Sequence, residues 1–140
     1  MSPPVTGVQM SAESHGLEVK LTHTPSGSTL MTQPPRDNGG TGAAFSPTDM
    51  VGAALASCAL TTLALTAGRE GLPWGDATAK VEKRMSPPPR RIAELVVSFQ
   101  MPKGLPKELR PRYEEIARGC PVSRSLHPDV AVPMTFSYPD

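Results

Sequence analysis

The sequence predicts an α+β fold in which small antiparallel sheets surround a long central helix. Segments with alternating apolar and polar residues lie on both sides of one long uncharged segment, residues 50–68. Alternation with a period of two is typical of half-buried strands, whereas a long apolar run behind a capping sequence is typical of a buried helix. The 140 residues suit one domain, and we expect a single domain over residues 1–140.

Three strands are expected before the helix. In the second of them, Leu17, Val19 and Leu21 alternate with charged and polar residues. Proline, glycine and serine residues separate these segments and predict turns at Gly16 and at residues 25–28. The three strands are predicted at residues 5–11, 17–23 and 29–32.

The long helix is expected to begin after Ser46 and to end near Gly68 or Gly71. Ser46 is placed as N-cap, Pro47 suits the first helical position, and the charge of Asp49 suits the N-terminal dipole. Few charges interrupt the helix, so nearly its whole circumference should be covered. It is long enough to span a membrane, but its many small and hydroxyl residues would insert poorly, and we expect no membrane association.

The remaining segments predict two further strands, two helices and a last strand. The strands at residues 77–85 and 91–101 are joined by a stiff loop that contains three consecutive prolines. A polar helix follows over 107–118, and its regular part is expected to start near Arg110 because of the adjacent proline. A short helix with Cys120 near its N-cap comes next, and the last strand is predicted at 130–136.

Composition excludes several classes of protein. Lys and Arg number 14 and Asp and Glu 13, so the chain lacks the basic excess of a nucleic-acid binder. Aromatic residues make up only 4%, so the core must be built from Ala, Val, Leu and Met. The amino-terminal residues show neither a basic stretch nor an apolar run, and we expect a cytoplasmic protein with reduced thiols.

Two cysteines are the first candidates for chemistry. Cys58 lies in the long helix, where a lone cysteine is commonly a small buried apolar residue. Cys120 lies at a helix N-terminus, where free N–H groups favour a thiolate and lower the pKa, although it could equally serve as a weak cap. Together they permit a dithiol–disulfide cycle. The spacing supports neither a zinc site nor a Cys–His hydrolase dyad.

Arg36 and Asp49 are the candidate companions of these thiols. An arginine near a thiol favours the thiolate, and a carboxylate can hold the guanidinium in a forked pair. The alternatives are a solvated loop cation for Arg36 and a helix-start carboxylate for Asp49. The glycine-rich run at residues 39–42 lacks the lysine of a phosphate-binding loop and predicts a turn.

Four motifs together resemble the OsmC/Ohr family of osmotically inducible and organic hydroperoxide resistance proteins, from about residue 15 to the end. The motifs are Gly39-Gly40-x-Gly42, Ser46-Pro47-Thr48-Asp49, Ala53-Ala54-Leu55-Ala56-Ser57-Cys58 and Gly119-Cys120-Pro121-Val122-Ser123.

The resemblance implies a thiol-dependent peroxidase that reduces organic hydroperoxides to alcohols, with Cys58 in the peroxidatic position and Cys120 in the resolving position. Arg36 falls near the family's loop arginine. The family's acidic position corresponds to Thr48 here, and Asp49 follows one residue later. The resemblance further implies an intertwined homodimer with sites at the interface, a small lipoyl-type dithiol as reductant, and no metal or organic cofactor. The alternatives are a non-catalytic OsmC-like protein that binds a small apolar ligand at the dimer interface, and a thiol hydrolase.

Overall fold

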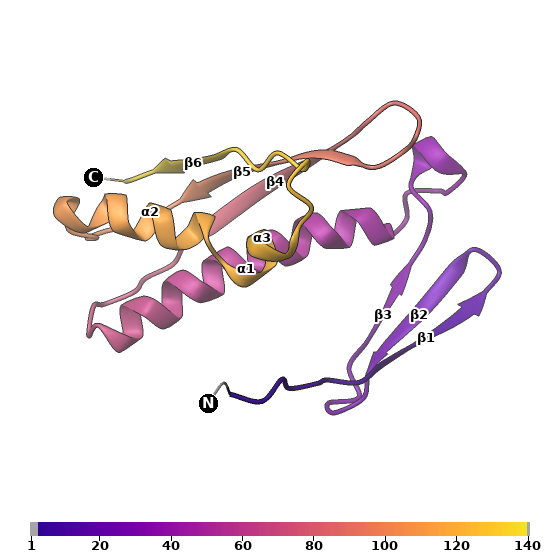
Figure 1. The fold of residues 1–140 in the computed structure, drawn as a ribbon, viewed down its shortest axis with the longest axis horizontal. Helices are drawn as coiled ribbons and strands as arrows, with labels where there is room; N and C mark the ends of the chain where they lie inside the picture. The colour runs from indigo at the N-terminus through magenta and orange to yellow at the C-terminus, as the bar shows by residue number, and fades with distance from the viewer. Residues whose placement is uncertain (1–2, 140) are drawn as a thin grey trace. The chain divides into compact units, whose positions relative to one another are not determined.

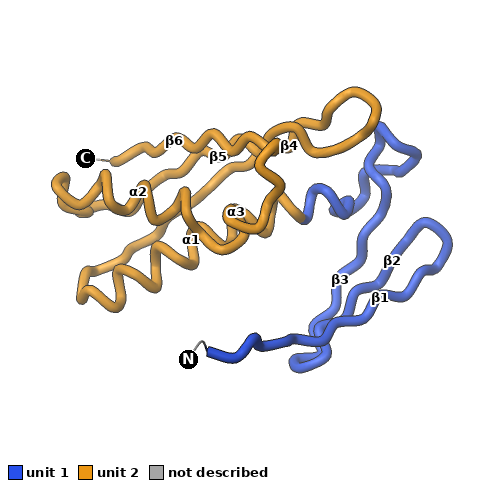
Figure 2. Tube along the Cα trace, viewed as in Figure 1, with its two compact units in different colours: residues 1–50 blue, residues 51–140 orange. Residues whose placement is uncertain are grey.

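The computed structural model describes residues 3–139 and divides them into two compact units. Unit 1 extends to Met50 and unit 2 begins at Val51 (Figure 2). The mixture of strands and helices confirms the predicted α+β class. The elements, labelled in Figure 1, are β1 (Met10–His15), β2 (Glu18–His23), β3 (Thr29–Thr32), the 3₁₀ helix η1 (Arg36–Asn38), α1 (Pro47–Arg69), β4 (Thr78–Met85), β5 (Ile92–Gln100), the 3₁₀ helix η2 (Lys107–Leu109), α2 (Arg110–Arg118), α3 (Pro121–Ser125) and β6 (Met134–Ser137).

Unit 1 contains an antiparallel sheet in the order β1-β2-β3. The first strand was predicted over residues 5–11, and this range is wrong, because β1 pairs with β2 from Met10 opposite His23 to His15 opposite Glu18. A two-residue turn that begins at Gly16 joins the two strands, and it sets this register. Gly16 has φ +65°, a conformation that a side chain would strain.

The loop between β3 and α1 folds tightly on itself. The amide of Gln33 donates to the carbonyl of Phe45 at 3.1 Å, which closes the loop at its base. Inside the loop, the amide of Gly40 donates to the carbonyl of Pro35 at 2.9 Å. A Cβ atom on Gly40 would lie 1.5 Å from the carbonyl oxygen of Pro34, so only glycine fits there. The loop therefore has one tightly determined path.

The predicted start of α1 is confirmed. The amide of Asp49 donates to Ser46 Oγ at 3.0 Å, and the amide of Ser46 donates to Asp49 Oδ2 at 2.9 Å, which together form a capping box. At the other end, the amide of Leu72 donates back to the carbonyl of Ala67 at 2.9 Å, and Gly71 takes φ +70°. This arrangement is typical of a helix end, because the left-handed residue turns the chain back onto the last carbonyls.

Within the described chain, α1 buries one face only. The buried residues recur every three or four positions: Gly52, Leu55, Ala59, Leu63 and Ala67. The opposite face is exposed and consists mainly of small residues: Ala54, Ser57, Thr61, Ala64 and Leu65. The expectation that nearly the whole circumference would be covered is therefore wrong for the single chain. By length and hydropathy α1 would also pass as a membrane span, as many core helices do.

Unit 2 contains a second sheet, in the order β4-β5-β6. Strands β4 and β5 are antiparallel, whereas β6 runs parallel to β5. This sheet is therefore mixed and not purely antiparallel as predicted. The reason is the connection: the chain crosses over through α2 and α3 before it returns as β6. The last strand is also shorter than predicted. Pro133 has no amide to donate to the ladder, so the regular strand begins only after it, and residue Ala131 forms an isolated bridge.

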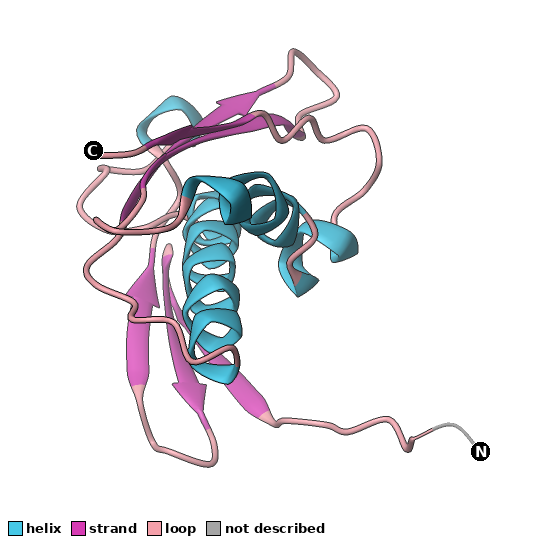
Figure 3. Cartoon of the chain, turned by 90° about the vertical axis from the view of Figure 1, so that its left-hand side faces the viewer, coloured by secondary structure: helices cyan, strands magenta, loops and turns pink. Residues whose placement is uncertain are grey.

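The core of unit 2 lies between this sheet and the helices. Leu95, Val97 and Phe99 of β5 point to one face and are buried. Helices α1 and α2 lie on the same side of the sheet (Figures 1 and 3). Gly52 allows α1 to approach closely, because a Cβ atom there would lie 3.4 Å from Leu95 Cδ2. Tyr113 of α2 is buried in the same cluster.

The predicted short helix after Cys120 is confirmed. Cys120 is the N-cap of α3 and Pro121 its first residue. The predicted regular start of the preceding helix at Arg110 is also confirmed, because residues 107–109 form η2 and α2 begins at Arg110.

Candidate functional site: a pair of cysteines

Cys58 lies in the middle of α1, half-buried, and packs against the core of unit 2. The hydroxyl of Thr62 donates to the carbonyl oxygen of Cys58 at 2.7 Å. The Cys58 side chain therefore projects from a regular, internally bonded part of the helix. The residue as a whole is partly exposed to solvent.

Cys120 lies at the turn between α2 and α3 and is fully buried. The Cys58 side chain lies close enough to act on the pKa of this thiol, so the two cysteines are neighbours in the fold. Both cysteines are free thiols. The fold of unit 2 thus brings together the two cysteines that the sequence places far apart.

The pKa of the Cys120 thiol is raised, mainly because burial disfavours the thiolate. The amides of Ser123 and Val122 lower it, since they face the sulfur from the first turn of α3, but the contact falls short of a capping hydrogen bond. The neighbouring Cys58 raises it further. The predicted lowering by the helix N-terminus is therefore wrong, because α3 has only five residues and burial outweighs its amides.

The two cysteines differ in their exposure to solvent. Because its pKa is raised, Cys120 keeps its proton to higher pH than an ordinary thiol does. Cys58 is the more exposed residue, whereas Cys120 is enclosed by the core. A small electrophile would therefore meet Cys58 first, and Cys120 would be its immediate intramolecular neighbour.

Arg36 is held by its own loop in unit 1. Its Nε atom donates to the carbonyl of Thr41 at 2.9 Å. A Cβ atom on Gly42 would lie 2.8 Å from that Nε atom, so the arginine side chain passes over a position that only glycine leaves open. The loop therefore orients the exposed guanidinium through backbone contacts.

Asp49 belongs to unit 1 and caps α1, where Oδ2 accepts the amide of Ser46. The bonds described for Arg36 and Asp49 thus go to different groups, Thr41 in one case and Ser46 in the other. A forked pair between the two side chains stays a prediction. Within residues 3–139, no group of three or more His, Cys, Asp or Glu residues is placed to hold a metal ion.

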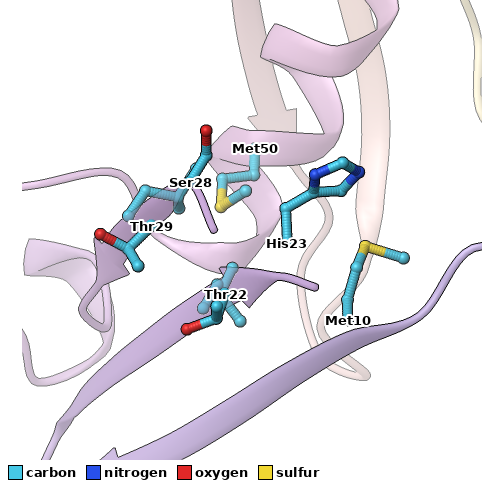
Figure 4. A pocket seen from close by; sticks show the side chains of 8 residues that line it. Met10, Thr22, His23, Ser28, Thr29 and Met50 are labelled. Carbon is cyan, nitrogen blue, oxygen red and sulfur yellow. The ribbon is translucent and has the colours of Figure 1, made fainter. Parts of the chain in front are cut away.

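An apolar cavity of about 200 Å³ opens on unit 1, on the face of the sheet that carries Met10 and Leu30. Figure 4 shows Met10, His23 and Met50 around it. The lining residues are Met10, Leu21, Thr22, His23, Ser28, Thr29, Leu30 and Met50. No sequence motif predicts this cavity, although the alternation along β2 predicts an apolar face of the sheet.

Comparison with known proteins defines the family to which this chain belongs. Residues 40–135 match the OsmC family, described as OsmC-like proteins. A crystal structure from Psychrobacter arcticus 273-4, of a protein described by osmotic stress induction and detoxification response, is 30% identical, with a TM-score of 0.84 and coverage of 97% of this chain and 98% of that one. The chain belongs to the OsmC family.

Two more distant structures share the fold. An organic hydroperoxide resistance protein OsmC from Legionella pneumophila is 20% identical, with a TM-score of 0.73 and coverage of 96% of this chain and 99% of that one. An organic hydroperoxide resistance protein from Elizabethkingia anophelis is 16% identical, with a TM-score of 0.77 and coverage of 98% and 99%. No sequence among the curated proteins matches this chain.

Proposed function

We propose that this protein is a thiol-dependent peroxidase that reduces organic hydroperoxides to alcohols. One observation carries the proposal: a partly exposed cysteine and a buried cysteine are close neighbours in the fold. A structural pair of buried cysteines would need no such difference in access. Membership of a family that includes hydroperoxide resistance proteins supports the same class of substrate.

In the first step, the Cys58 thiolate attacks the distal oxygen of the hydroperoxide. The O–O bond breaks, the hydroxyl group stays on sulfur as a sulfenic acid, and the leaving alkoxide takes a proton and becomes the alcohol. The apolar residues around Cys58 in the core of unit 2 favour organic hydroperoxides over hydrogen peroxide.

In the second step, the sulfur of Cys120 attacks the sulfenic acid of Cys58. A disulfide forms and the hydroxyl group leaves as water with the proton of the Cys120 thiol. Burial favours this order, because Cys120 is protected from external peroxide but adjacent to Cys58. A small dithiol of the lipoyl type would then reduce the disulfide by thiol–disulfide exchange.

Arg36 and Asp49 are proposed as the supporting charges of this site. A guanidinium beside Cys58 would offset the cost of ionising a partly buried thiol. The backbone contact of Arg36 with Thr41 supports this role, because it orients the side chain before substrate binds. Asp49 would act with it while one of its oxygens caps α1.

A cytoplasmic homodimer is the proposed state of the molecule. Large apolar side chains are exposed on the single chain, among them Met10 at 71%, Phe45 at 56% and Leu65 at 52%. Exposed apolar surface of this kind is typical of protein interfaces. Sedimentation equilibrium should therefore give twice the mass of the chain, and a monomer at micromolar concentration would contradict this proposal.

The peroxidase is tested with cumene hydroperoxide and a dithiol reductant. Cys58→Ser should abolish turnover, because it removes the attacking sulfur. Cys120→Ser should still form one sulfenic acid at Cys58, which dimedone traps and mass spectrometry detects, but it should not form the intramolecular disulfide. Turnover that survives in Cys58→Ser would rule out the mechanism.

A second candidate is a protein that binds an apolar small molecule without turnover, at an interface between two copies. The apolar cavity of unit 1 favours it, although about 200 Å³ holds only a short alkyl chain. Thiol titration with a bimane reagent before and after cumene hydroperoxide distinguishes the two. A peroxidase loses both thiols together, whereas a simple binding protein keeps both.

A further inference from the structure

We propose that Arg124 is a positioning residue for Cys120, and this inference rests on the proposed peroxidase cycle. Arg124 lies in α3, and its exposed side chain turns back toward the end of α2. Its Nε atom donates to the carbonyl oxygen of Gly119 at 2.7 Å. Its own amide donates to the carbonyl oxygen of Cys120 at 3.0 Å. One residue thus binds the carbonyls of both Gly119 and Cys120.

The contact with Gly119 matters because of peptide geometry. The carbonyl of Gly119 and the amide of Cys120 belong to one rigid peptide plane. A rotation of that plane would swing the Cα–Cβ bond of Cys120 and move its sulfur away from Cys58. Glycine offers the least resistance to such a rotation, because it has no side chain to restrict its backbone. The guanidinium supplies the restraint that Gly119 lacks.

The surroundings of Gly119 are consistent with a restraint by Arg124. A Cβ atom at this position would lie 3.4 Å from a terminal nitrogen of Arg124 and 3.5 Å from the carbonyl oxygen of Glu115. Both are ordinary van der Waals distances, so the guanidinium packs directly beside Gly119. The amide of Cys120 itself makes only a long bond of 3.4 Å to Ala117, so it restrains the plane weakly. Arg124 makes the shorter contact on the other edge of the same plane.

The direct test measures how fast the disulfide closes. After a single equivalent of cumene hydroperoxide, dimedone and Cys120 compete for the sulfenic acid of Cys58, and mass spectrometry gives the fraction that each captures. Arg124→Ala should slow disulfide closure about tenfold, because a displacement of about 1 Å is enough for such losses. The rate at which Cys58 is first oxidised should not change, since Arg124 does not touch that sulfur.

Three further variants separate positioning from general stability. Gly119→Ala combined with Arg124→Ala should recover part of the closure rate, because alanine restricts the peptide plane without the guanidinium. Arg91→Ala is the matched control: it removes an exposed arginine that donates to the carbonyl of Ile92 at 3.0 Å, and it should close at the wild-type rate. If Arg124→Ala does not fold, Arg124→Lys decides, with closure about two- to fourfold slower expected from a less rigid donor.

Closure at the wild-type rate in a folded Arg124→Ala variant, or in Arg124→Lys where that variant decides, would overturn the inference. An equilibrium measurement tests the role of Arg124 separately from the peroxidase proposal. If the wild-type protein forms no sulfenic acid with hydroperoxide, the peroxidase proposal fails. The Cys58–Cys120 disulfide can still be equilibrated with a glutathione buffer, and its equilibrium constant should fall about tenfold in Arg124→Ala. An unchanged constant would refute the positioning role by itself.

Discussion

The loop that carries Arg36 offers a sharp mutational test at Gly40. In Gly40→Ala, the new Cβ atom would lie 1.5 Å from the carbonyl oxygen of Pro34, whereas real contacts of this kind begin near 3.0 Å. The backbone must therefore move by about 1.5 Å. The obstructing atom belongs to the main chain, so no rotation of a side chain can relieve the clash.

Two hydrogen bonds lie in the path of this movement. They are the bond from the amide of Gly40 to Pro35 and the bond from Arg36 Nε to Thr41, each 2.9 Å long. At about 1 kcal/mol each, their loss should lower the free energy of unfolding by about 2 kcal/mol. If Arg36 supports the Cys58 thiolate, a displacement of this size should also reduce kcat/KM for cumene hydroperoxide about 10- to 100-fold.

The assay combines urea unfolding with steady-state peroxidase kinetics. Gly39→Ala is the matched control, because its Cβ atom would meet nothing within 4 Å although φ is +92°. It should lose about 1–2 kcal/mol to backbone strain and keep most of kcat/KM. Wild-type stability and kcat/KM in Gly40→Ala would refute the reasoning. A loss of stability with unchanged kcat/KM would support the described loop geometry but contradict a role of Arg36 in the mechanism.

Three other predictions concern the Cys120 thiol, Tyr138 and the N-cap of α1. Because burial raises the pKa of Cys120, this thiol should resist iodoacetamide at pH 8 in the folded protein and react in urea, as peptide mass spectrometry would show; early labelling contradicts this. Burial, and then its hydrogen bond to Glu114, raise the pKa of Tyr138 above its ordinary value of 10.0. The unfolded chain therefore loses the phenolic proton first, so the free energy of unfolding should fall as pH rises above about 10, and Tyr138→Phe should remove that part of the fall. Ser46→Ala should lower the free energy of unfolding by about 1 kcal/mol in urea titrations, because the amide of Asp49 loses its partner; an unchanged midpoint and slope would contradict the cap.

Local features were predictable because their causes lie within a few residues. The start of α1 follows from Ser46, Pro47 and Asp49, whose capping contacts span three residues. The short helix after Cys120 follows in the same way from the adjacent proline. The parallel pairing of β6 was not predictable, since its partner β5 is a distant segment and the direction depends on the crossover between them.

The same distinction between local and long-range causes applies to the candidate site. Its cysteines stand out in the sequence because there are only two, and their motifs resemble the OsmC/Ohr family. The sign of the pKa shift at Cys120 was missed, because a helix N-terminus is a local feature, whereas burial depends on everything that packs around the thiol. The restraint by Arg124 was also missed, since a guanidinium four residues after Cys120 has no motif of its own.

The amino-acid order was sufficient to define the helix boundaries, most strands and the residues with chemical potential, because capping, alternation and turn preferences act over short range. The folded chain decided that Cys58 and Cys120 meet, that one is accessible and the other enclosed, and that only one face of α1 is covered. These outcomes depend on solvent exclusion and on contacts between distant segments, which no short stretch of sequence contains.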